Sequence, residues 1–283
     1  MPFRAYAKIN LALLVKEKRP DGFHNIETVF HRIDLFDEIT FEAADDIVVH
    51  SSDAAAPSDE RNICHKAATL LQERLGARRG VRISIQKNIP VGAGLGGGSS
   101  DAATVLRELP KFWGHSVDDA TLHQPALQLG SDVPYFLHRG TALGRGRGEI
   151  LEYFDLDIPF TILLCYPGVH VSTAWAYQQV KPSVGGETID LRAILTDGMK
   201  NPSLLRAKLR NDFEPIVFKQ FPVIKEVKEM MLNAGAEFAL MSGSGSSVFG
   251  LFSGKEAAIV TEEVMKKRGW VTHISGFFRS SGG

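Results

Sequence analysis

Residues 89–103 have the sequence IPVGAGLGGGSSDAA, and the rest of the chain is best interpreted outward from them. Five glycines fall between positions 92 and 98. Glycine has no Cβ, so the backbone there can adopt a positive φ and bring several N–H groups close to a ligand. The next residues, 99–109, favour a helix with Ser99 or Ser100 near its N-cap. A glycine-rich loop that leads into a helix N-terminus predicts a phosphate-binding site.

Two familiar phosphate loops fit this stretch poorly. Residues 92–97 have the spacing G-x-G-x-x-G of a dinucleotide-binding loop, but the preceding strand, 81–86, alternates apolar and polar residues. The first strand of a dinucleotide-binding domain is instead a nearly continuous apolar run. A Walker loop does not fit either, because no Lys-Ser or Lys-Thr pair follows the last glycine. A flexible Gly/Ser linker would lack the adjoining helix. The sequence therefore predicts a third kind of phosphate loop.

The composition is that of an ordinary globular protein. The chain has 283 residues, 44% of them hydrophobic and 23% charged, with a formal net charge of −1. This length favours two lobes, and the charge gives no support to nucleic-acid or membrane binding. Cys64 and Cys165 lack metal-ligand spacing, so we expect two small buried hydrophobes in a reducing cytoplasm. We expect neither a membrane span nor a targeting peptide.

Polar residues interrupt the first predicted strand, 3–15. Lys8 and Asn10 lie two positions apart, so both face the same side of that strand. They belong either to a cleft or to a solvated outer face, and the strand alone does not decide between these. Further strands are predicted over 26–33 and 38–49, and a helix over 62–75.

Three further stretches have both a functional and a structural interpretation. Phe23 and His24 follow the turn 19–22 and could stack on a ligand or simply be solvated. Asp132, next to the Gly130-Ser131 pair, either caps the following helix or acts as a base near a phosphate. Residues 242–247, SGSGSS, form either a tight turn between two apolar strands or a second backbone wall of the anion site.

Taken together, residues 8–11, 90–103 and 242–247 resemble the three signature motifs of the GHMP kinases. The similarity extends from about residue 4 to about residue 278. It implies an α+β, two-lobed fold with a glycine-rich phosphate loop and a cleft between the lobes. Residues 1–152 would form the N-terminal ATP-binding lobe, and residues 153–283 the C-terminal lobe that contributes to the substrate cleft.

The resemblance also implies an activity. Residues 19–24, 96–100 and 130–134 look like the branch of the family that makes isoprenoid precursors without mevalonate. ATP, as its Mg²⁺ complex, would phosphorylate the 2-hydroxyl of a cytidine diphosphate-linked methylerythritol in the cytoplasm. Asp132 would take the hydroxyl proton, and Lys8 beside it would orient the acid and stabilise negative charge. No dedicated protein ligand of the metal is expected.

The other site residues that the resemblance implies fall into two groups. Those near ATP are Asn62, Lys87, Pro90, Val91, Gly92, Ala93, Gly94, Leu95, Gly96, Gly97, Gly98, Ser99 and Ser100. Those near the substrate are Asn10, Phe23, His24, Thr173 and Tyr177, with Phe23 and Tyr177 flanking the cytosine ring.

Two alternatives stay open at this point. The first is another GHMP small-alcohol kinase, of the homoserine or mevalonate type, against which the Phe23-His24 turn argues. The second is a non-catalytic nucleotide-binding regulator on the same fold, against which Lys8 and Asp132 argue. The sequence does not indicate an oligomeric state.

Overall fold

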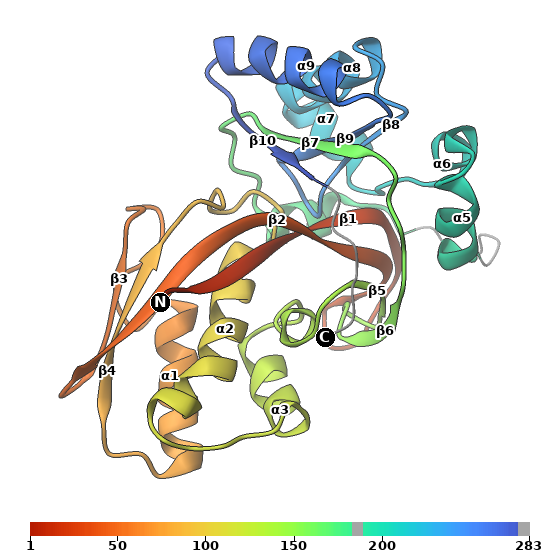
Figure 1. Ribbon diagram of the computed structural model, residues 1–283. Helices are drawn as coiled ribbons and strands as arrows, with labels where there is room; N and C mark the ends of the chain where they lie inside the picture. Colours follow the sequence, from red (N-terminus) through yellow and green to blue (C-terminus); the bar gives the residue numbers. More distant parts are fainter. Residues whose placement is uncertain (183–188, 277–283) are drawn as a thin grey trace. The chain divides into compact units, whose positions relative to one another are not determined.

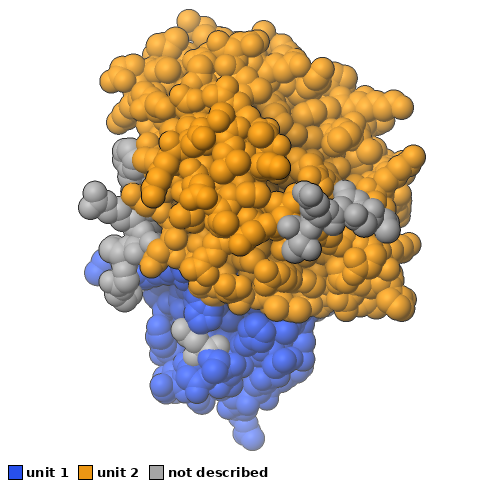
Figure 2. Space-filling model, turned by 90° about the vertical axis from the view of Figure 1, so that its right-hand side faces the viewer, with its two compact units in different colours: residues 1–7, 35–91, 96–139 blue, residues 8–34, 92–95, 140–283 orange. Residues whose placement is uncertain are grey.

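The computed structural model describes residues 1–182 and 189–276, which form mixed helices and strands (Figure 1). They divide into two compact units, coloured separately in Figure 2. Unit 1 comprises residues 1–7, 35–91 and 96–139, and unit 2 comprises residues 8–34, 92–95 and 140–283. Neither unit is one continuous segment of chain. The lobes expected over 1–152 and 153–283 stay a prediction.

Two long strands, β1 (Phe3–Lys18) and β2 (His24–Ala44), contribute residues to both units. The predicted turn joins them: Gly22 has a φ of 87°, and its N–H donates to the carbonyl of Arg19. The prediction of two separate strands over 26–33 and 38–49 is wrong, because β2 is one continuous strand. Residues 34–37 contain neither glycine nor proline, so β2 runs through them and changes its partner from β5 to β4.

In unit 1, β4 (Gly80–Gln86) pairs in parallel with β3 (Ile47–Ser51) and antiparallel with β2. The helical elements are α1 (Ile63–Leu75), α2 (Gly97–Phe112), α3 (Asp119–Leu129) and the short 3₁₀ helix η1 (Pro134–Leu137). Helices α1 and α2 pack side by side (Figure 1). The Asn62 side chain begins α1 by accepting a hydrogen bond from the N–H of Cys64, and Gly76 ends it in the left-handed conformation.

Helix α2 begins earlier than the sequence predicts. Its N-cap is Gly96, with a φ of 70°, and the Gly96 carbonyl accepts from the N–H of Ser100 at 2.9 Å. The left-handed glycine turns the chain directly into the helix, so no serine side chain is needed as a cap. Ser99 and Ser100 therefore lie within the first turn of α2.

In unit 2, β5 (Thr141–Arg145) and β6 (Ile150–Phe154) form an antiparallel hairpin. An antiparallel sheet has the order β10-β7-β9-β8, from β7 (Thr161–Tyr166), β8 (Phe238–Met241), β9 (Val248–Phe252) and β10 (Val271–Ser275). The helices are α4 (Thr173–Gln179), α5 (Leu191–Gly198), α6 (Pro202–Lys208), α7 (Glu214–Gln220), α8 (Pro222–Asn233) and α9 (Lys255–Lys267). The composition of residues 181–202 favours a loop, and Gly185 and Gly186 within this stretch lie outside the described residues.

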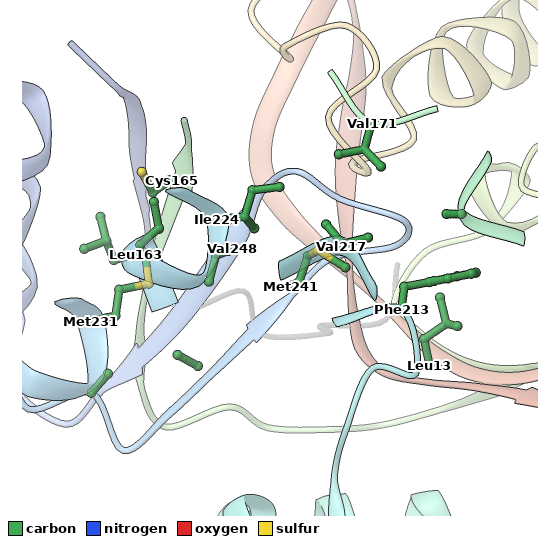
Figure 3. Close-up of a cluster of buried hydrophobic side chains, with 14 of the residues drawn as sticks. Leu13, Leu163, Cys165, Val171, Phe213, Val217, Ile224, Met231, Met241 and Val248 are labelled. Atoms are coloured by element: carbon green, nitrogen blue, oxygen red, sulfur yellow. The ribbon is translucent and has the colours of Figure 1, made fainter. Parts of the chain in front are cut away.

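The core of unit 2 joins the sheet to its helices and to β1. Phe213, Val217 and Met231 pack there with Leu13 of β1 and Val248 of β9 (Figure 3). Each is almost fully buried, and burial of such a side chain stabilises the fold by about 1.5–3 kcal/mol. This packing fixes β1, the strand that carries Lys8 and Asn10.

Candidate active site

The glycine-rich loop has the backbone that the sequence predicts. Gly92, Gly94 and Gly96 have φ angles of 67°, 80° and 70°. An L-residue rarely adopts these angles, so glycine is required at each position. The loop ends at the N-terminus of α2, where the first N–H groups of the helix have no partner within it. The arrangement suits an anion.

The predicted backbone wall, residues 242–247, packs against the loop within unit 2. Ser242 Oγ donates to the Gly94 carbonyl at 2.9 Å, and Ser247 N–H donates to the Ala93 carbonyl at 3.1 Å. A Cβ at Gly94 would lie 2.2 Å from the Ser242 carbonyl oxygen. The turn therefore holds residues 93 and 94 in place and leaves no room for a side chain at Gly94.

Lys8 and Asn10 are buried in unit 2, with 3% and 2% of their surfaces exposed, so the solvated-face alternative is wrong. Lys8 Nζ donates to Asn10 Oδ1 at 2.6 Å and to the Gly94 carbonyl at 3.1 Å. Asn10 Nδ2 in turn donates to Thr28 Oγ1 at 2.7 Å. The ammonium is thus fixed against the glycine loop.

Asp132 is half-buried in unit 1, between Gly130 and η1. The N-cap of η1 is Val133, and no side chain makes a capping hydrogen bond there. Val133 therefore takes the N-cap position that the structural alternative gave to Asp132, and the interpretation of Asp132 as a base stays a prediction.

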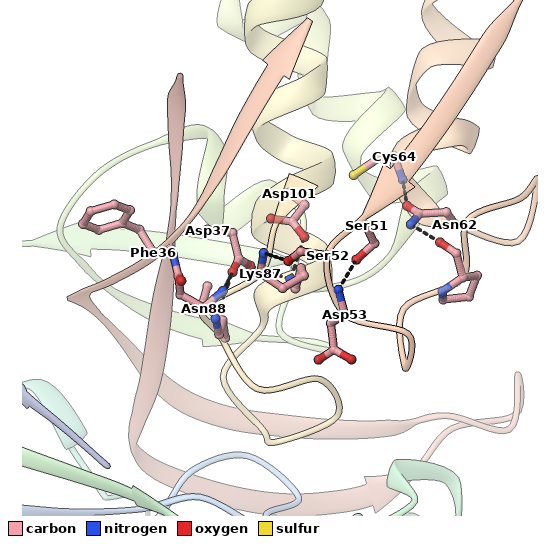
Figure 4. A network of polar contacts seen from close by, with 12 residues as sticks. Phe36, Asp37, Ser51, Ser52, Asp53, Asn62, Cys64, Lys87, Asn88 and Asp101 are labelled. Carbon is pink, nitrogen blue, oxygen red and sulfur yellow. Dashed lines mark hydrogen bonds and ion pairs between the residues drawn. The ribbon is translucent and has the colours of Figure 1, made fainter. Parts of the chain in front are cut away.

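The two other residues predicted near ATP, Asn62 and Lys87, have firm partners within unit 1. Asn62 uses its amide oxygen to cap α1 and its amide nitrogen to donate to the Pro57 carbonyl at 2.6 Å. Lys87 Nζ is paired with two carboxylates, those of Asp37 and Asp101 (Figure 4). Both side chains are therefore held in place before any ligand binds.

The residues predicted near the substrate base form two aromatic contacts in unit 2. The His24 ring stacks on that of Tyr177, with centroids 5.4 Å apart and planes 21° apart. Tyr177 also meets Phe213 edge-on at 4.9 Å, so part of it packs against the core. Phe23 is 51% exposed and lies under the guanidinium of Arg147, 4.8 Å from its Cζ. Burial and the charge of Lys18 lower the pKa of His24, which favours its neutral form.

Thr173 begins α4 and reaches the serine-glycine turn. Its Oγ1 lies 2.9 Å from Ser244 Oγ, within hydrogen-bonding distance. Sequence reasoning gave Ser242 only as part of the turn 242–247, and it missed Asp37, Asp101 and Arg147. Only Asp101 carried a signal, since it directly follows the two serines of the loop.

Among residues 1–182 and 189–276, no group of three or more His, Cys, Asp or Glu side chains could hold a metal ion. Within the same described part of the chain, no helix is long and apolar enough to span a membrane.

A glycine-rich loop against which a buried lysine and a serine-glycine turn pack is typical of enzymes that bind phosphate groups. The family model described as GHMP kinases N terminal domain matches residues 62–140, and the model described as GHMP kinases C terminal matches residues 191–269. The chain belongs to the GHMP kinase family. It is accordingly an ATP-dependent phosphotransferase that acts on an alcohol group of a small molecule.

Two relatives with 45–47% sequence identity carry the same name. The 4-diphosphocytidyl-2-C-methyl-D-erythritol kinase of Chlorobium limicola is 45% identical over 96% of this chain and 95% of its own. That of Chlorobium phaeobacteroides is 47% identical over 88% of each chain. A solved structure of 4-(cytidine 5'-diphospho)-2C-methyl-D-erythritol kinase superposes with a TM-score of 0.83, at 36% identity and complete coverage of both chains. A homoserine kinase of Cytophaga hutchinsonii, 22% identical with a TM-score of 0.71 over 96% and 94% of the two chains, shows the shared fold.

Proposed function

We propose that this chain uses ATP to phosphorylate the 2-hydroxyl of 4-diphosphocytidyl-2-C-methyl-D-erythritol, a cytoplasmic step of the non-mevalonate route to isoprenoid precursors. The observation that carries the proposal is the 45% identity to a kinase of that name over 95% of its length. The half-exposed Phe23 and the stacked His24–Tyr177 pair offer aromatic surfaces to a nucleobase, which a kinase of a small alcohol does not require.

The direct test is an ATP-consumption assay with three candidate acceptors. We expect turnover with the cytidylated methylerythritol and none above background with homoserine or mevalonate. Turnover with either small alcohol alone would support the other type of GHMP kinase. Binding of ATP without turnover of any acceptor would support a regulator.

ATP binding is assigned to the glycine-rich loop and the start of α2. The loop N–H groups hold the phosphates, with Ser99 and Ser100 on the first helical turn nearby. Mg²⁺ enters as part of the nucleotide complex, where it neutralises charge on the phosphate oxygens. No dedicated protein ligand is assigned to the ion, and the described residues show no group of three or more His, Cys, Asp or Glu side chains that could hold one.

Proton transfer and charge stabilisation are assigned to two residues. Asp132 accepts the proton of the substrate hydroxyl, and the Lys8 ammonium stabilises the negative charge that develops during transfer. Phosphoryl transfer depends mainly on positioning and electrostatics, so a buried and hydrogen-bonded ammonium suits this task. Asn10 fixes the ammonium, as its Oδ1 accepts from Lys8 Nζ.

Lys8→Met should lower kcat while changing the KM for ATP little. The methionine keeps the buried stem of the side chain but removes the ammonium, and loss of one charge-stabilising donor costs roughly 10²–10³-fold in kcat. Steady-state kinetics at varied ATP measures both constants. Lys16→Met, on the same strand but with a partly exposed side chain paired to Glu27, is the matched control. A large rise in KM with normal kcat would make Lys8 a simple ATP contact.

Tyr177→Ala should weaken cytidyl and uridyl substrate analogues alike. Stacking on a base contributes about 1–3 kcal/mol and does not distinguish bases, because every base has a π-face. Discrimination is assigned to hydrogen bonds from His24, so the wild-type enzyme should strongly prefer cytidyl. Steady-state kcat/KM for both analogues tests this, with Tyr177→Phe as the control that retains a ring. Equal values for the two bases in the wild type would contradict a cytosine pocket.

A further inference from the structure

A buried charge cluster lies at the base of the glycine-rich loop, entirely within unit 1. It consists of Asp37 on β2, Lys87 after β4 and Asp101 on α2 (Figure 4). Their side chains are 0%, 5% and 4% exposed. Lys87 Nζ donates to Asp101 Oδ2 at 2.8 Å and also pairs with Asp37 Oδ2. Burying a charge this deeply costs free energy unless the charge is paired and hydrogen-bonded.

Asp37 also holds the backbone that enters the loop. Its Oδ1 accepts from the N–H of Asn88 at 2.6 Å and from the N–H of Ile89 at 2.8 Å. With Lys87, three donors surround this carboxylate, which suits a group that carries negative charge. The chain is therefore fixed at residues 87–89, directly before Pro90.

Lys87 connects this entry point to the exit of the loop. Asp101 follows Ser100 in the first turns of α2, so the Lys87–Asp101 pair joins the two ends of the segment 88–100. A Cβ at Gly97 would lie 3.3 Å from Lys87 Nζ. The ammonium thus lies against the first residue of the helix whose N–H groups are assigned to the phosphates.

The charges of the cluster do not balance if both acids are ionised. Two carboxylates and one ammonium would leave one net negative charge, and Asp101 Oδ1 is buried without a hydrogen-bond partner. Burial raises the pKa of Asp101 to about 7; Asp37 acts in the same direction, and Lys87 opposes it. Burial alone would lower the pKa of Lys87, but Asp101 and Asp37 outweigh it and raise that pKa, so Lys87 keeps its charge.

One further titratable group faces the cluster from α1. Burial raises the pKa of the Cys64 thiol well above its usual value, and the charge of Asp101 acts in the same direction. The thiol therefore stays protonated and adds no charge. A proton on Asp101 is what makes the cluster neutral.

We propose that Asp37, Lys87 and Asp101 form a charge clasp that holds the two ends of the glycine-rich loop together, and that loss of the Asp101 proton weakens nucleotide binding. The inference rests on the proposed role of this loop in binding ATP. An added negative charge below the N-terminus of α2 opposes the positive end of the helix dipole and repels the triphosphate. All three are positioning residues, which act through the loop.

The test is calorimetric binding of MgATP to the full chain between pH 6.5 and pH 8.5, without the alcohol substrate. The wild-type Kd should rise ~10-fold over this range, equivalent to about 1.4 kcal/mol. Asp101→Asn keeps an oxygen for Lys87 but cannot ionise, so its Kd should stay near the tight value. The protonation of MgATP itself changes equally in the wild-type and Asp101→Asn experiments. The ratio of the two Kd values therefore reports only the pH effect that comes from the protein. Glu108→Gln, also a paired acid on α2, should behave as the wild type.

A second measurement needs no variant. Above pH 7, binding of MgATP to the wild-type protein should take up a fraction of a proton, measured by repeating the calorimetry in buffers of different ionisation enthalpy. Zero uptake, or the same pH dependence in Asp101→Asn as in the wild type, would overturn the inference. Wild-type protein that fails to bind MgATP would overturn both the inference and the proposed function. MgATP binding without phosphorylation of the cytidylated substrate would count against the proposed function alone.

Discussion

Asp132→Asn should lower kcat by roughly 10²–10⁴-fold while leaving the KM for ATP and for the alcohol substrate nearly unchanged. Asparagine has almost the same shape as aspartate but cannot accept the hydroxyl proton. Asp132 is half-buried and lies directly before Val133, the N-cap of η1. Steady-state kinetics with both substrates varied measures the three constants.

Asp118→Asn is the control for this variant. Asp118 is the N-cap of α3, where its side chain accepts from the N–H of Thr121, and asparagine caps helices equally well. Its kcat should match that of the wild type. Near-normal turnover of Asp132→Asn would remove Asp132 from the chemistry and require another base.

Gly94→Ala should strongly impair ATP binding. Gly94 has a φ of 80°, and an added Cβ would lie 2.2 Å from the Ser242 carbonyl oxygen. The backbone strain and the clash each cost about 1–3 kcal/mol, so the loop must move away from the serine-glycine turn. The Gly94 carbonyl, which accepts from Lys8, moves with it. We expect the Kd for MgATP to rise roughly 10–100-fold, measured by calorimetry.

Gly98→Ala in the same segment separates this effect from a general loss of loop flexibility. A Cβ at Gly98 would meet only Ile63 Cγ2, at an ordinary 3.7 Å, and Gly98 lies in helical backbone. Its MgATP affinity should stay close to that of the wild type. Thermal unfolding of both variants checks that the fold is retained. Unchanged affinity in a folded Gly94→Ala variant would show that the phosphates bind elsewhere, and equal losses in the two variants would contradict the specific role of the Gly94 position.

Local sequence patterns predicted the elements that depend on local chemistry. The left-handed glycines of the loop and the helix predicted over 62–75 follow from residues within a few positions of each other. The predicted N-cap of α2, Ser99 or Ser100, was wrong. Serine is a common N-cap residue, whereas a left-handed glycine at this position depends on the conformation of the loop. The long β2 was divided in two, since polar residues in a strand resemble a turn when the pairing partners are unknown.

The partners of the charged residues could not be predicted. Lys87 directly precedes the predicted phosphate loop, so the resemblance placed it near ATP and not between two carboxylates. Its partner Asp37 lies 50 positions earlier in the sequence, and nothing near Asp37 indicates that β2 passes below the loop. The burial of Lys8 likewise depends on β1 packing in the core of unit 2, which only the tertiary structure provides.

The interleaving of the two units limits how this enzyme could have been assembled or divided by gene recombination. β1 hydrogen-bonds to distant parts of unit 2: Asp212 Oδ2 accepts from the N–H of Val15, and Ser242 Oγ accepts from the N–H of Asn10. A fragment that ends at residue 152 contains β1 but neither of these partners. An exchange of halves between related kinases would therefore have to preserve both sets of contacts at once. A chain cut at residue 152 would leave the N–H groups of Asn10 and Val15 without these acceptors.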